Sequence, residues 1–371
     1  MKVAILSNST SDIVKARGDL IKCIIEQGHE VVAIGNENIN VKKIEKLGAK
    51  SINIKNNCIS ISLYKNIRYI IELVKVLKKE KVEVLLGYSV KPIILGSIAG
   101  KIAKTKEIYA LVVGMGYNYS INTFRTRIVR VFCDIGYRLA FKIDKKVIFQ
   151  NKEDKEELVG KKYVKPEKAV LIDGSGVNMK KFVKTNNYIK SMDNLTFLMI
   201  SRGIKVKGLE ELSKAARRIH KKYPLCKFVH IGEIEKSYRG ISKQQLKIYS
   251  QDIEFRGKVD KVYDYIKKAN VVILPSYLRE GIPRGLLEAL AVGRPIITTN
   301  LRGCKETVIN GINGYLIKEK NIDDLEEKIL LMINSSPEQL REMSEKSYEL
   351  AKKRFDIEII NKKMLEYMNL F

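Results

Sequence analysis

Residues 274–300 of the chain, LPSYLREGIPRGLLEALAVGRPIITTN, decide which fold we expect. The apolar run 271–274 that leads into them predicts a buried parallel strand, which a proline then ends. A helix is expected over residues 285–292, because a glycine and a proline follow it, and the run 296–299 predicts the next strand. Strand, helix and strand in this order are typical of a parallel α/β sheet.

Two carboxylates frame the start of this expected helix. Glu280 precedes it and Glu288 lies inside it, so the two can reach different parts of one extended ligand. A helix N-terminus carries unpaired N–H groups and a partial positive charge, which suit a phosphate. Carboxylates accept hydrogen bonds from neighbouring sugar hydroxyls. The pattern indicates a site for a polyhydroxylated, negatively charged ligand, although Glu288 taken alone would more often be a helix surface residue.

The spacing of these carboxylates, E-x7-E inside EGIPRGLLEALAVGRP, resembles the signature of retaining glycosyltransferases of family 4. That family has the GT-B architecture, in which two Rossmann-like doubly wound α/β domains face each other across a cleft. Within the family, the resemblance is strongest to bacterial enzymes that extend lipid-linked oligosaccharides for capsule, O-antigen or glycoprotein glycans. Three further segments carry the resemblance over nearly the whole chain: Ser201-Arg202 with Lys207-Gly208, GSGVN at 174–178 and FRG at 255–257.

The resemblance implies a role for each matching residue. Arg202 and Lys207 would neutralise the diphosphate of a nucleotide sugar, and with Glu280 they form the expected catalytic set. Taken singly, both cations would be solvated charges in a chain rich in lysine and arginine, but their position just after a predicted strand favours the phosphate role. The further donor-binding candidates are Glu288 for the ribose hydroxyls, the backbone at Gly281 and Ile282 for the sugar or phosphate, and Arg256 for the base pocket.

Cations and a helix terminus can stabilise a leaving diphosphate without a metal ion. The chain has no Asp-x-Asp motif. We therefore expect no metal and no cofactor beyond the UDP-sugar, which is a co-substrate. None of the three histidines, His29, His220 and His230, is expected to act as a general base.

A chain of 371 residues is too long for one ordinary core. We expect an N-terminal Rossmann-like acceptor and membrane-docking domain over residues 1–182 and a C-terminal Rossmann-like donor domain over 183–355. The polar stretch 183–194, VKTNNYIKSMDN, is the expected linker between them. In GT-B enzymes a terminal helix, here residues 356–371, returns to the first domain.

The composition indicates a globular protein of the cytoplasm. Hydrophobic residues make up 45% of the chain, and no apolar run is long enough to span a membrane. The first residues, MKVAIL, predict a strand, because they lack the features of a secretory signal. The five cysteines are scattered and show neither a disulfide framework nor metal-ligand spacing, which favours a reducing compartment.

The formal net charge of +27 predicts an anionic partner. Within residues 123–146 basic side chains alternate with large apolar ones, a pattern that can lie on an anionic membrane. Arg125, Arg127 and Arg130 are the membrane-contact candidates, and we expect a peripheral enzyme on the inner face of the cell membrane. The alternative is a merely solvated basic surface. Nucleic acid is not expected, because no nucleic-acid-binding motif accompanies the charge.

The N-terminal half departs from the family, since the loop after the first strand, NSTSD at 8–12, is not glycine-rich and GYSVKP at 87–92 lacks a histidine. Ser9, Arg17, Lys91 and Tyr117 are candidates for acceptor contacts, with plain loop structure as an equal alternative.

We expect a retaining glycosyltransferase that moves a hexose or N-acetylhexosamine from a UDP-sugar to a polyprenyl-diphosphate-linked saccharide in bacterial surface glycan synthesis. The alternatives are a GDP- or ADP-sugar-dependent transferase with a soluble acceptor, a non-catalytic sugar-nucleotide-binding protein, or a basic nucleic-acid-binding protein.

Overall fold

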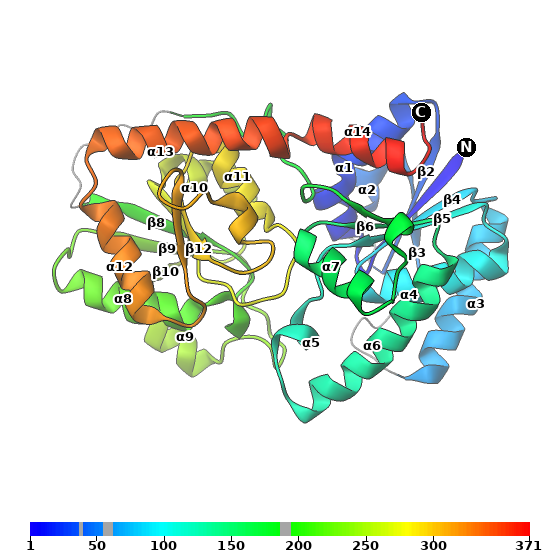
Figure 1. Ribbon diagram of the computed structural model, residues 1–371, viewed down its shortest axis with the longest axis horizontal. Coiled ribbons are helices and arrows are strands. Elements are labelled where there is room, and N and C mark those ends of the chain that lie inside the picture. Colours follow the sequence, from blue (N-terminus) through cyan, green and yellow to red (C-terminus); the bar gives the residue numbers. More distant parts are fainter. Residues whose placement is uncertain (37–39, 55–61, 186–193) are drawn as a thin grey trace. The chain divides into compact units, whose positions relative to one another are not determined.

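The computed structural model describes residues 1–36, 40–54, 62–185 and 194–371. The chain forms two compact units, of which unit 1 comprises Met1–Ser175 with Ile357–Phe371 and unit 2 comprises Gly176–Asp356. Most of the expected linker, at residues 186–193, lies outside the described residues, as does Cys58. Each unit contains one parallel sheet covered by helices (Figure 1), which confirms the expected pair of doubly wound α/β domains.

The sheet of unit 1 has seven parallel strands in the order β3-β2-β1-β4-β5-β6-β7. The chain adds strands outward from β1 to β3 on one side, then returns to place β4 beside β1 and adds strands outward to β7 on the other side. This order is the doubly wound pattern. The strands are β1 (Lys2–Leu6), β2 (Glu30–Gly35), β3 (Lys50–Asn53), β4 (Val84–Tyr88), β5 (Glu107–Val112), β6 (Lys146–Phe149) and β7 (Ala169–Leu171).

Side chains alternate between the two faces of the sheet along β1, so the hydrophobic core of unit 1 lies on both faces. Val3 and Ile5 belong to the cluster that packs α1, α2 and α14, whereas Ala4 and Leu6 belong to the cluster that packs α3 and α4. A third cluster joins α6 and α7 to the sheet. The helices are α1 (Thr10–Glu26), α2 (Val41–Glu45), α3 (Leu63–Lys79), α4 (Val90–Ala103), α5 (Tyr117–Ser120), α6 (Phe124–Ile143), α7 (Lys152–Gly160) and α14 (Ile357–Tyr367), with a 3₁₀ turn at Pro166–Lys168.

Unit 2 repeats the same strand order with six parallel strands, β10-β9-β8-β11-β12-β13, around one continuous hydrophobic core. Its strands are β8 (Thr196–Ile200), β9 (Lys227–Ile231), β10 (Glu254–Phe255), β11 (Val271–Leu274), β12 (Ile296–Thr299) and β13 (Gly314–Ile317). Its helices are α8 (Leu209–His220), α9 (Lys243–Tyr249), α10 (Val262–Lys268), α11 (Arg284–Val292), α12 (Ile322–Ile333) and α13 (Pro337–Leu350), with 3₁₀ turns η3 (Lys205–Lys207) and η4 (Lys305–Thr307) and the π-helical turn η5 (Ala351–Phe355).

The boundary between the units falls after Ser175, earlier than the expected position after residue 182. The reason is that Val177 is buried in the core of unit 2 and its amide donates to the carbonyl of Phe355 at 2.8 Å. Asp356 also belongs to unit 2, so the terminal segment of unit 1 begins at Ile357, one residue later than expected. From there α14 packs against α1, and Ile360 and Met364 complete the unit 1 core.

No helix within the described ranges combines the length and the apolarity that crossing a bilayer requires.

A buried carboxyl group lies where α6 ends. Asp144 is fully buried, and its burial raises the pKa of the carboxyl well above the usual range, with the Ser97 hydroxyl and the Lys168 ammonium opposing this shift. A raised folded-state pKa means that the contribution of this group to stability is complete below the unfolded-state pKa near 3.8 and is lost as the pH rises above it.

Asp144→Asn should therefore stabilise the protein at neutral pH, because the amide is uncharged in both the folded and the unfolded state. The melting temperature should rise by about 2–4 °C for each kcal/mol of relieved penalty, and the gain over the parent should shrink towards about pH 4. Thermal unfolding of both proteins across this pH range measures the effect. Glu167→Gln, at an exposed carboxylate, is the control and should leave the melting temperature unchanged. A lower melting temperature for Asp144→Asn at neutral pH would contradict the assignment.

Candidate active site

The candidate site of unit 2 lies where β8 and β11 end side by side. These two parallel strands are neighbours in the sheet, and the chain leaves β8 and β11 towards opposite sides of it. Such a switch point opens a crevice outside the carboxyl ends of the strands, which is where doubly wound sheets bind ligands. The loop 201–208 follows β8 and the loop 275–283 follows β11. All the residues expected in the catalytic set come from these two loops.

An ion pair joins the two loops. Lys207 Nζ lies 2.5 Å from Glu280 Oε1, and Ser276 Oγ donates to the same oxygen at 3.0 Å. The Lys207 side chain is 8% exposed and that of Glu280 is 18% exposed. A charge pair so shielded from water is held much more firmly than a surface pair. Removal of either partner would leave the other as a buried charge without a counterion. The structure thus brings two of the expected catalytic residues into direct contact.

Two glycines allow the loops to approach each other this closely. Gly208 has a φ of 82°, and a Cβ at this position would lie 2.2 Å from the carbonyl oxygen of Pro275. Gly303, in the loop after β12, has a φ of 81°, and its Cβ would lie 2.1 Å from the carbonyl oxygen of Gly281. Any side chain at either position would push the backbone around Glu280 away from Lys207.

The second carboxylate, Glu288, lies at the middle of α11. That helix begins at Arg284, directly after Pro283, and Arg284 NH2 binds Glu288 Oε1 at 3.0 Å across one helical turn. The side chain of Glu288 is 12% exposed, so the arginine orients a carboxylate that is largely withdrawn from solvent. Ile282, just before the helix, is buried in the apolar core, which leaves only its backbone for ligand contact.

The two expected arginines at the edges of the site are more exposed. Arg202 NH1 binds Glu235 Oε2 at 3.2 Å, and the arginine side chain is 62% exposed. Arg256 pairs with Glu254 and is 54% exposed. Exposed pairs of this kind exchange partners at little cost, so either guanidinium can turn to an anionic ligand.

Three side chains at the site were not expected from the sequence, namely Ser276, Arg284 and Glu235. Arg284 stands four residues before Glu288, a helical spacing that could have revealed it. Glu235 is 33 residues away from Arg202, and Ser276 is four residues from Glu280 within a loop that has no helical spacing, so only the folded structure reveals these two contacts.

Two buried groups border the site. Burial lowers the pKa of His230 to about 4, so this imidazole is uncharged near neutral pH, and its Nε2 lies 3.3 Å from Ser201 Oγ. Burial first, and then the Glu280 carboxylate, raise the pKa of Cys304 to about 12, which keeps it a thiol.

Among the residues that the structure describes, no three His, Cys, Asp or Glu side chains gather as metal ligands would.

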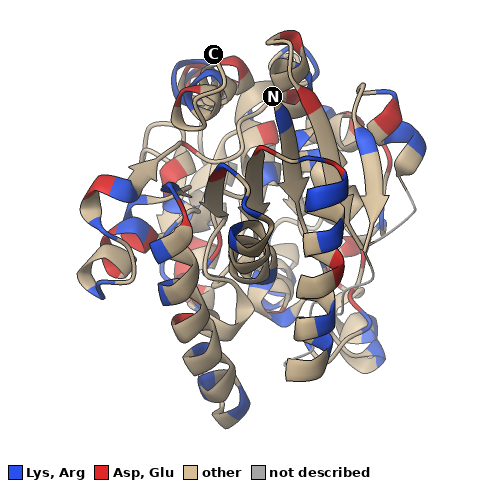
Figure 2. Cartoon of the chain, turned by 90° about the vertical axis from the view of Figure 1, so that its right-hand side faces the viewer, with Lys and Arg blue, Asp and Glu red and all other residues tan. Residues whose placement is uncertain are grey.

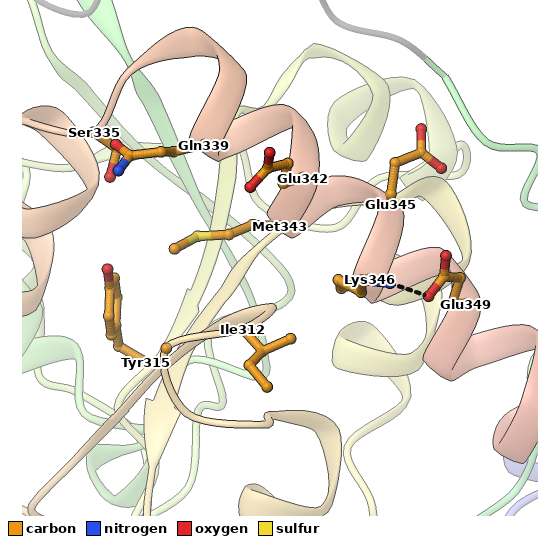
Figure 3. A pocket seen from close by; sticks show the side chains of 10 residues that line it. Ile312, Tyr315, Ser335, Gln339, Glu342, Met343, Glu345, Lys346 and Glu349 are labelled. Atoms are coloured by element: carbon orange, nitrogen blue, oxygen red, sulfur yellow. Dashed lines mark hydrogen bonds and ion pairs between the residues drawn. The ribbon is translucent and has the colours of Figure 1, made fainter.

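Unit 2 also has an open pocket elsewhere, with a volume of about 650 Å³, between α13 and the segment 311–315 (Figure 3). Ile312, Tyr315 and Met343 give it an apolar floor, and none of the expected site residues lines it. Its acidic rim is largely neutralised, because Lys346 binds Glu349 at 2.8 Å and Lys184 binds Glu345. The pocket therefore offers no convergent charge for a sugar nucleotide.

Comparison with known proteins agrees with this arrangement. The family model of glycosyl transferases group 1 matches residues 181–350, and that of glycosyl transferase 4-like proteins matches residues 2–151. A UDP-Gal:alpha-D-GlcNAc-diphosphoundecaprenol alpha-1,3-galactosyltransferase of Escherichia coli is 30% identical over 283 residues, which are 72% of this chain and 70% of that protein. The chain belongs to the group 1 glycosyltransferases. This group is glycosyltransferase family 4, whose members are retaining.

Other relatives of this glycosyltransferase cover more of the chain. An N,N'-diacetylbacillosaminyl-diphospho-undecaprenol alpha-1,3-N-acetylgalactosaminyltransferase of Campylobacter jejuni is 29% identical over 345 residues, 90% of this chain and 89% of the relative. Among solved structures, a glycosyltransferase from Rickettsia africae has a TM-score of 0.75 at 20% identity, covering 100% of this chain and 98% of that one. HepE of Anabaena, in complex with UDP-glucose, has a TM-score of 0.80 at 16% identity, with both chains fully covered. These likenesses confirm the GT-B fold.

Three of the four acceptor candidates of the glycosyltransferase lie at the carboxyl edge of the unit 1 sheet. Ser9 follows β1 and caps α1, accepting from the Ser11 amide at 3.1 Å, and Lys91 lies in the first turn of α4, which follows the neighbouring strand β4. Tyr117 begins α5, after β5. Arg17 is buried, with its guanidinium carbon 5.4 Å from the centre of the Tyr88 ring. Arg17 thus lies within the fold, while the other three remain at the sheet edge.

The expected membrane segment, residues 123–146, is not one continuous surface. The helix α6 ends at Ile143, Lys145 pairs with Glu107, and Arg138 stacks 4.5 Å from the Tyr163 ring. The surface available to a membrane is therefore confined to the exposed face of α6. That face carries Arg125 and Arg127, with the partly buried Arg130 beside it, and both Arg127 and Arg130 donate to Asn122 Oδ1 at 2.9 Å.

Loss of the charge pair should abolish turnover by this glycosyltransferase. Lys207→Ala and Glu280→Gln should each lower kcat by about a hundredfold or more, because each removes a charged contact at the point where the loops meet. Initial rates at saturating nucleotide sugar measure this, with thermal unfolding to verify that the variants are folded. Lys214→Ala is the matched control, because it breaks an exposed lysine–glutamate pair on α8 and should retain full activity. Near-parental rates in both folded variants would exclude the pair from catalysis.

Proposed function

We propose that this glycosyltransferase moves a sugar from a UDP-sugar to a polyprenyl-diphosphate-linked saccharide. The observation that carries the proposal is the Lys207–Glu280 pair at the switch point of unit 2, because a cation and a carboxylate lie together at the sheet edge where doubly wound folds bind their ligands. Two relatives over most of the chain support the acceptor class, since both are named for diphospho-undecaprenol substrates. The name of the E. coli relative supports UDP as the nucleotide.

Lys207 and Arg202 would stabilise the charge that develops on the departing diphosphate. Lys207 supplies a nearly buried point charge, which acts strongly because water screens it little. Arg202 is exposed and pairs with Glu235, so its guanidinium can leave that carboxylate for a phosphate. The two cations together serve the leaving group, which is the main electrostatic task of the reaction.

The carboxylates would orient the rest of the donor. Lys207 and Ser276 fix Glu280 Oε1 from two sides, so the carboxylate is preorganised to accept hydrogen bonds from sugar hydroxyls. Arg284 fixes Glu288 in the same way for the ribose. In a retaining transfer the new bond forms on the face from which the diphosphate leaves, so no side chain is needed as a nucleophile.

We expect transfer to be independent of metal ions and specific for UDP among nucleotides. A panel of UDP-, GDP- and ADP-sugars with an undecaprenyl-diphosphate-linked saccharide, assayed in excess EDTA, tests both expectations together. Product should form from a UDP-sugar and survive the chelator, because Lys207 and Arg202 supply the positive charge. A strict requirement for Mg²⁺ or Mn²⁺ would contradict the role of the two cations. Turnover restricted to GDP- or ADP-sugars, or to soluble acceptors, would contradict the proposed substrates.

We also propose that the enzyme works peripherally at the inner face of the cell membrane. A polyprenyl-linked acceptor stays in the bilayer, so the enzyme must come to it. The cationic face of α6 supports this location, because each Lys or Arg near an anionic surface contributes about 1 kcal/mol of attraction.

Reversal of Arg125, Arg127 and Arg130 to Glu should weaken binding to anionic vesicles and transfer to a lipid-linked acceptor, while donor hydrolysis persists. Binding by the parent should also fall as salt rises, because salt screens the attraction. Vesicle sedimentation at low and high ionic strength measures both effects. Reversal of Lys222, Lys243 and Lys247, which are exposed in unit 2, changes the net charge equally and should have little effect. Equal binding by the parent and the arginine variant would show that α6 charge does not guide docking.

A further inference from the structure

The most exposed large apolar side chains of the described residues lie at the N-terminal ends of two helices of unit 1. They are Phe124, 81% exposed, and Leu63 and Tyr64, each 74% exposed. Phe124 is the first residue of α6, and Leu63 and Tyr64 are the first two residues of α3. Large apolar side chains left this exposed at neighbouring helix ends mark a surface that contacts something other than water.

Each helix continues the exposed apolar ridge along its length. On α6 the exposed residues recur at helical spacing, and so they lie on one side of the helix, opposite the buried Tyr137 and Phe141. On α3 they lie opposite the buried Leu73 and Leu77. The ridge of α6 comprises Phe124, Ile128, Val131, Phe132, Ile135 and Leu139, and that of α3 comprises Leu63, Tyr64, Ile67 and Ile71.

Basic side chains border both ridges. Arg125, Arg127 and Lys142 are exposed on α6, and Lys75 and Lys78 are exposed on α3. An apolar strip edged by lysine and arginine is the pattern of a helix that lies in a bilayer interface, with its apolar side among the acyl chains and its cations at the headgroups.

The two helices form one surface because both pack on α4. Helix α4 contacts both α3 and α6. Figure 2 shows α3 and α6 on the two sides of α4, with blue basic residues along both, and Figure 1 shows their N-terminal ends at the same, lower, end of unit 1. Leu63, Tyr64 and Phe124 can therefore meet one plane together.

We propose that α3 is a second membrane-contacting helix, and that the N-terminal ends of α3 and α6 insert their apolar side chains into an anionic bilayer. This inference rests on the proposed membrane location and adds to it a new element, α3, and a new force, apolar insertion. Charge brings the enzyme to the surface, and burial of Leu63, Tyr64 and Phe124 among acyl chains holds it there.

A bilayer suits this surface better than a second copy of the chain. Two copies joined through these ridges would bring the cations of α3 and α6 against their own counterparts, in a chain whose net charge is already +27. An anionic headgroup layer neutralises those cations instead. The apolar ridges likewise have no counterpart in a nucleic acid backbone.

The chain contains no tryptophan, so a single introduced one reports its own surroundings. Tyr64→Trp on α3 should show a blue-shifted emission on adding vesicles of phosphatidylglycerol and phosphatidylethanolamine, and brominated acyl chains in the same vesicles should quench it. Tyr238→Trp is the matched control, at a tyrosine that is 48% exposed in unit 2, and its emission should not change.

A second pair of variants separates insertion from attraction. Leu63→Gln combined with Tyr64→Gln should weaken vesicle binding by roughly ten- to hundredfold, because two apolar side chains no longer leave water. That loss should persist at high salt, unlike the loss caused by reversing the α6 arginines. Leu225→Gln, at a residue 62% exposed in unit 2, is the control and should bind as the parent does.

Each outcome decides a different claim. If the parent binds vesicles while the tryptophan at position 64 is neither shifted nor quenched, the role of α3 is overturned and the membrane location stands. If the parent does not bind anionic vesicles at all, both are overturned. A blue shift that appears without vesicles and grows with protein concentration would assign the surface to self-association and also overturn the inference.

Discussion

The contact between Lys207 and Glu280 depends on nearly every feature of unit 2. It requires β8 and β11 to be neighbours, so that two loops separated by 73 residues in sequence meet at one edge of the sheet. It requires glycine at positions 208 and 303, because any side chain there would occupy the space of a neighbouring carbonyl. Burial makes the contact strong, since a charge pair away from water is screened little, and burial also makes it costly to break. A site built in this way has its electrostatics set before a ligand arrives.

The same strand order occurs in both units, but the chemistry at the two sheet edges differs. In unit 2 the switch point carries opposite charges in contact. In unit 1 the corresponding edge carries hydroxyl groups and Lys91, while Arg17 is withdrawn against the Tyr88 ring. In unit 2 the charged pair lies where a diphosphate is proposed to leave. In unit 1 the basic side chains lie on the surface where a membrane is proposed to bind. One fold used twice can support two kinds of recognition, because function resides in the loops and not in the sheet.

Local sequence signals predicted most of the fold. The glycine and proline that follow α11 located this helix to within one residue, and β11 and β12 occupy the ranges that their apolar runs indicate. Contacts across long sequence separations, such as Arg202 with Glu235 or Val177 with Phe355, depend on packing that no local pattern encodes. The sequence also could not show that α3 exposes an apolar ridge, because its periodicity does not reveal which side of the helix packs inward.

The position of α14 has a consequence for how the protein is made. Its residues Ile360 and Met364 complete the hydrophobic core of unit 1, although they lie at the far end of the sequence from the strands they cover. A ribosome releases the first 175 residues long before it releases this helix, so the nascent unit 1 must wait with one apolar face uncovered while the whole of unit 2 is synthesised. The final stabilisation of unit 1 therefore comes only after unit 2 has been synthesised. Until α14 packs, the uncovered apolar face makes the growing chain prone to aggregation.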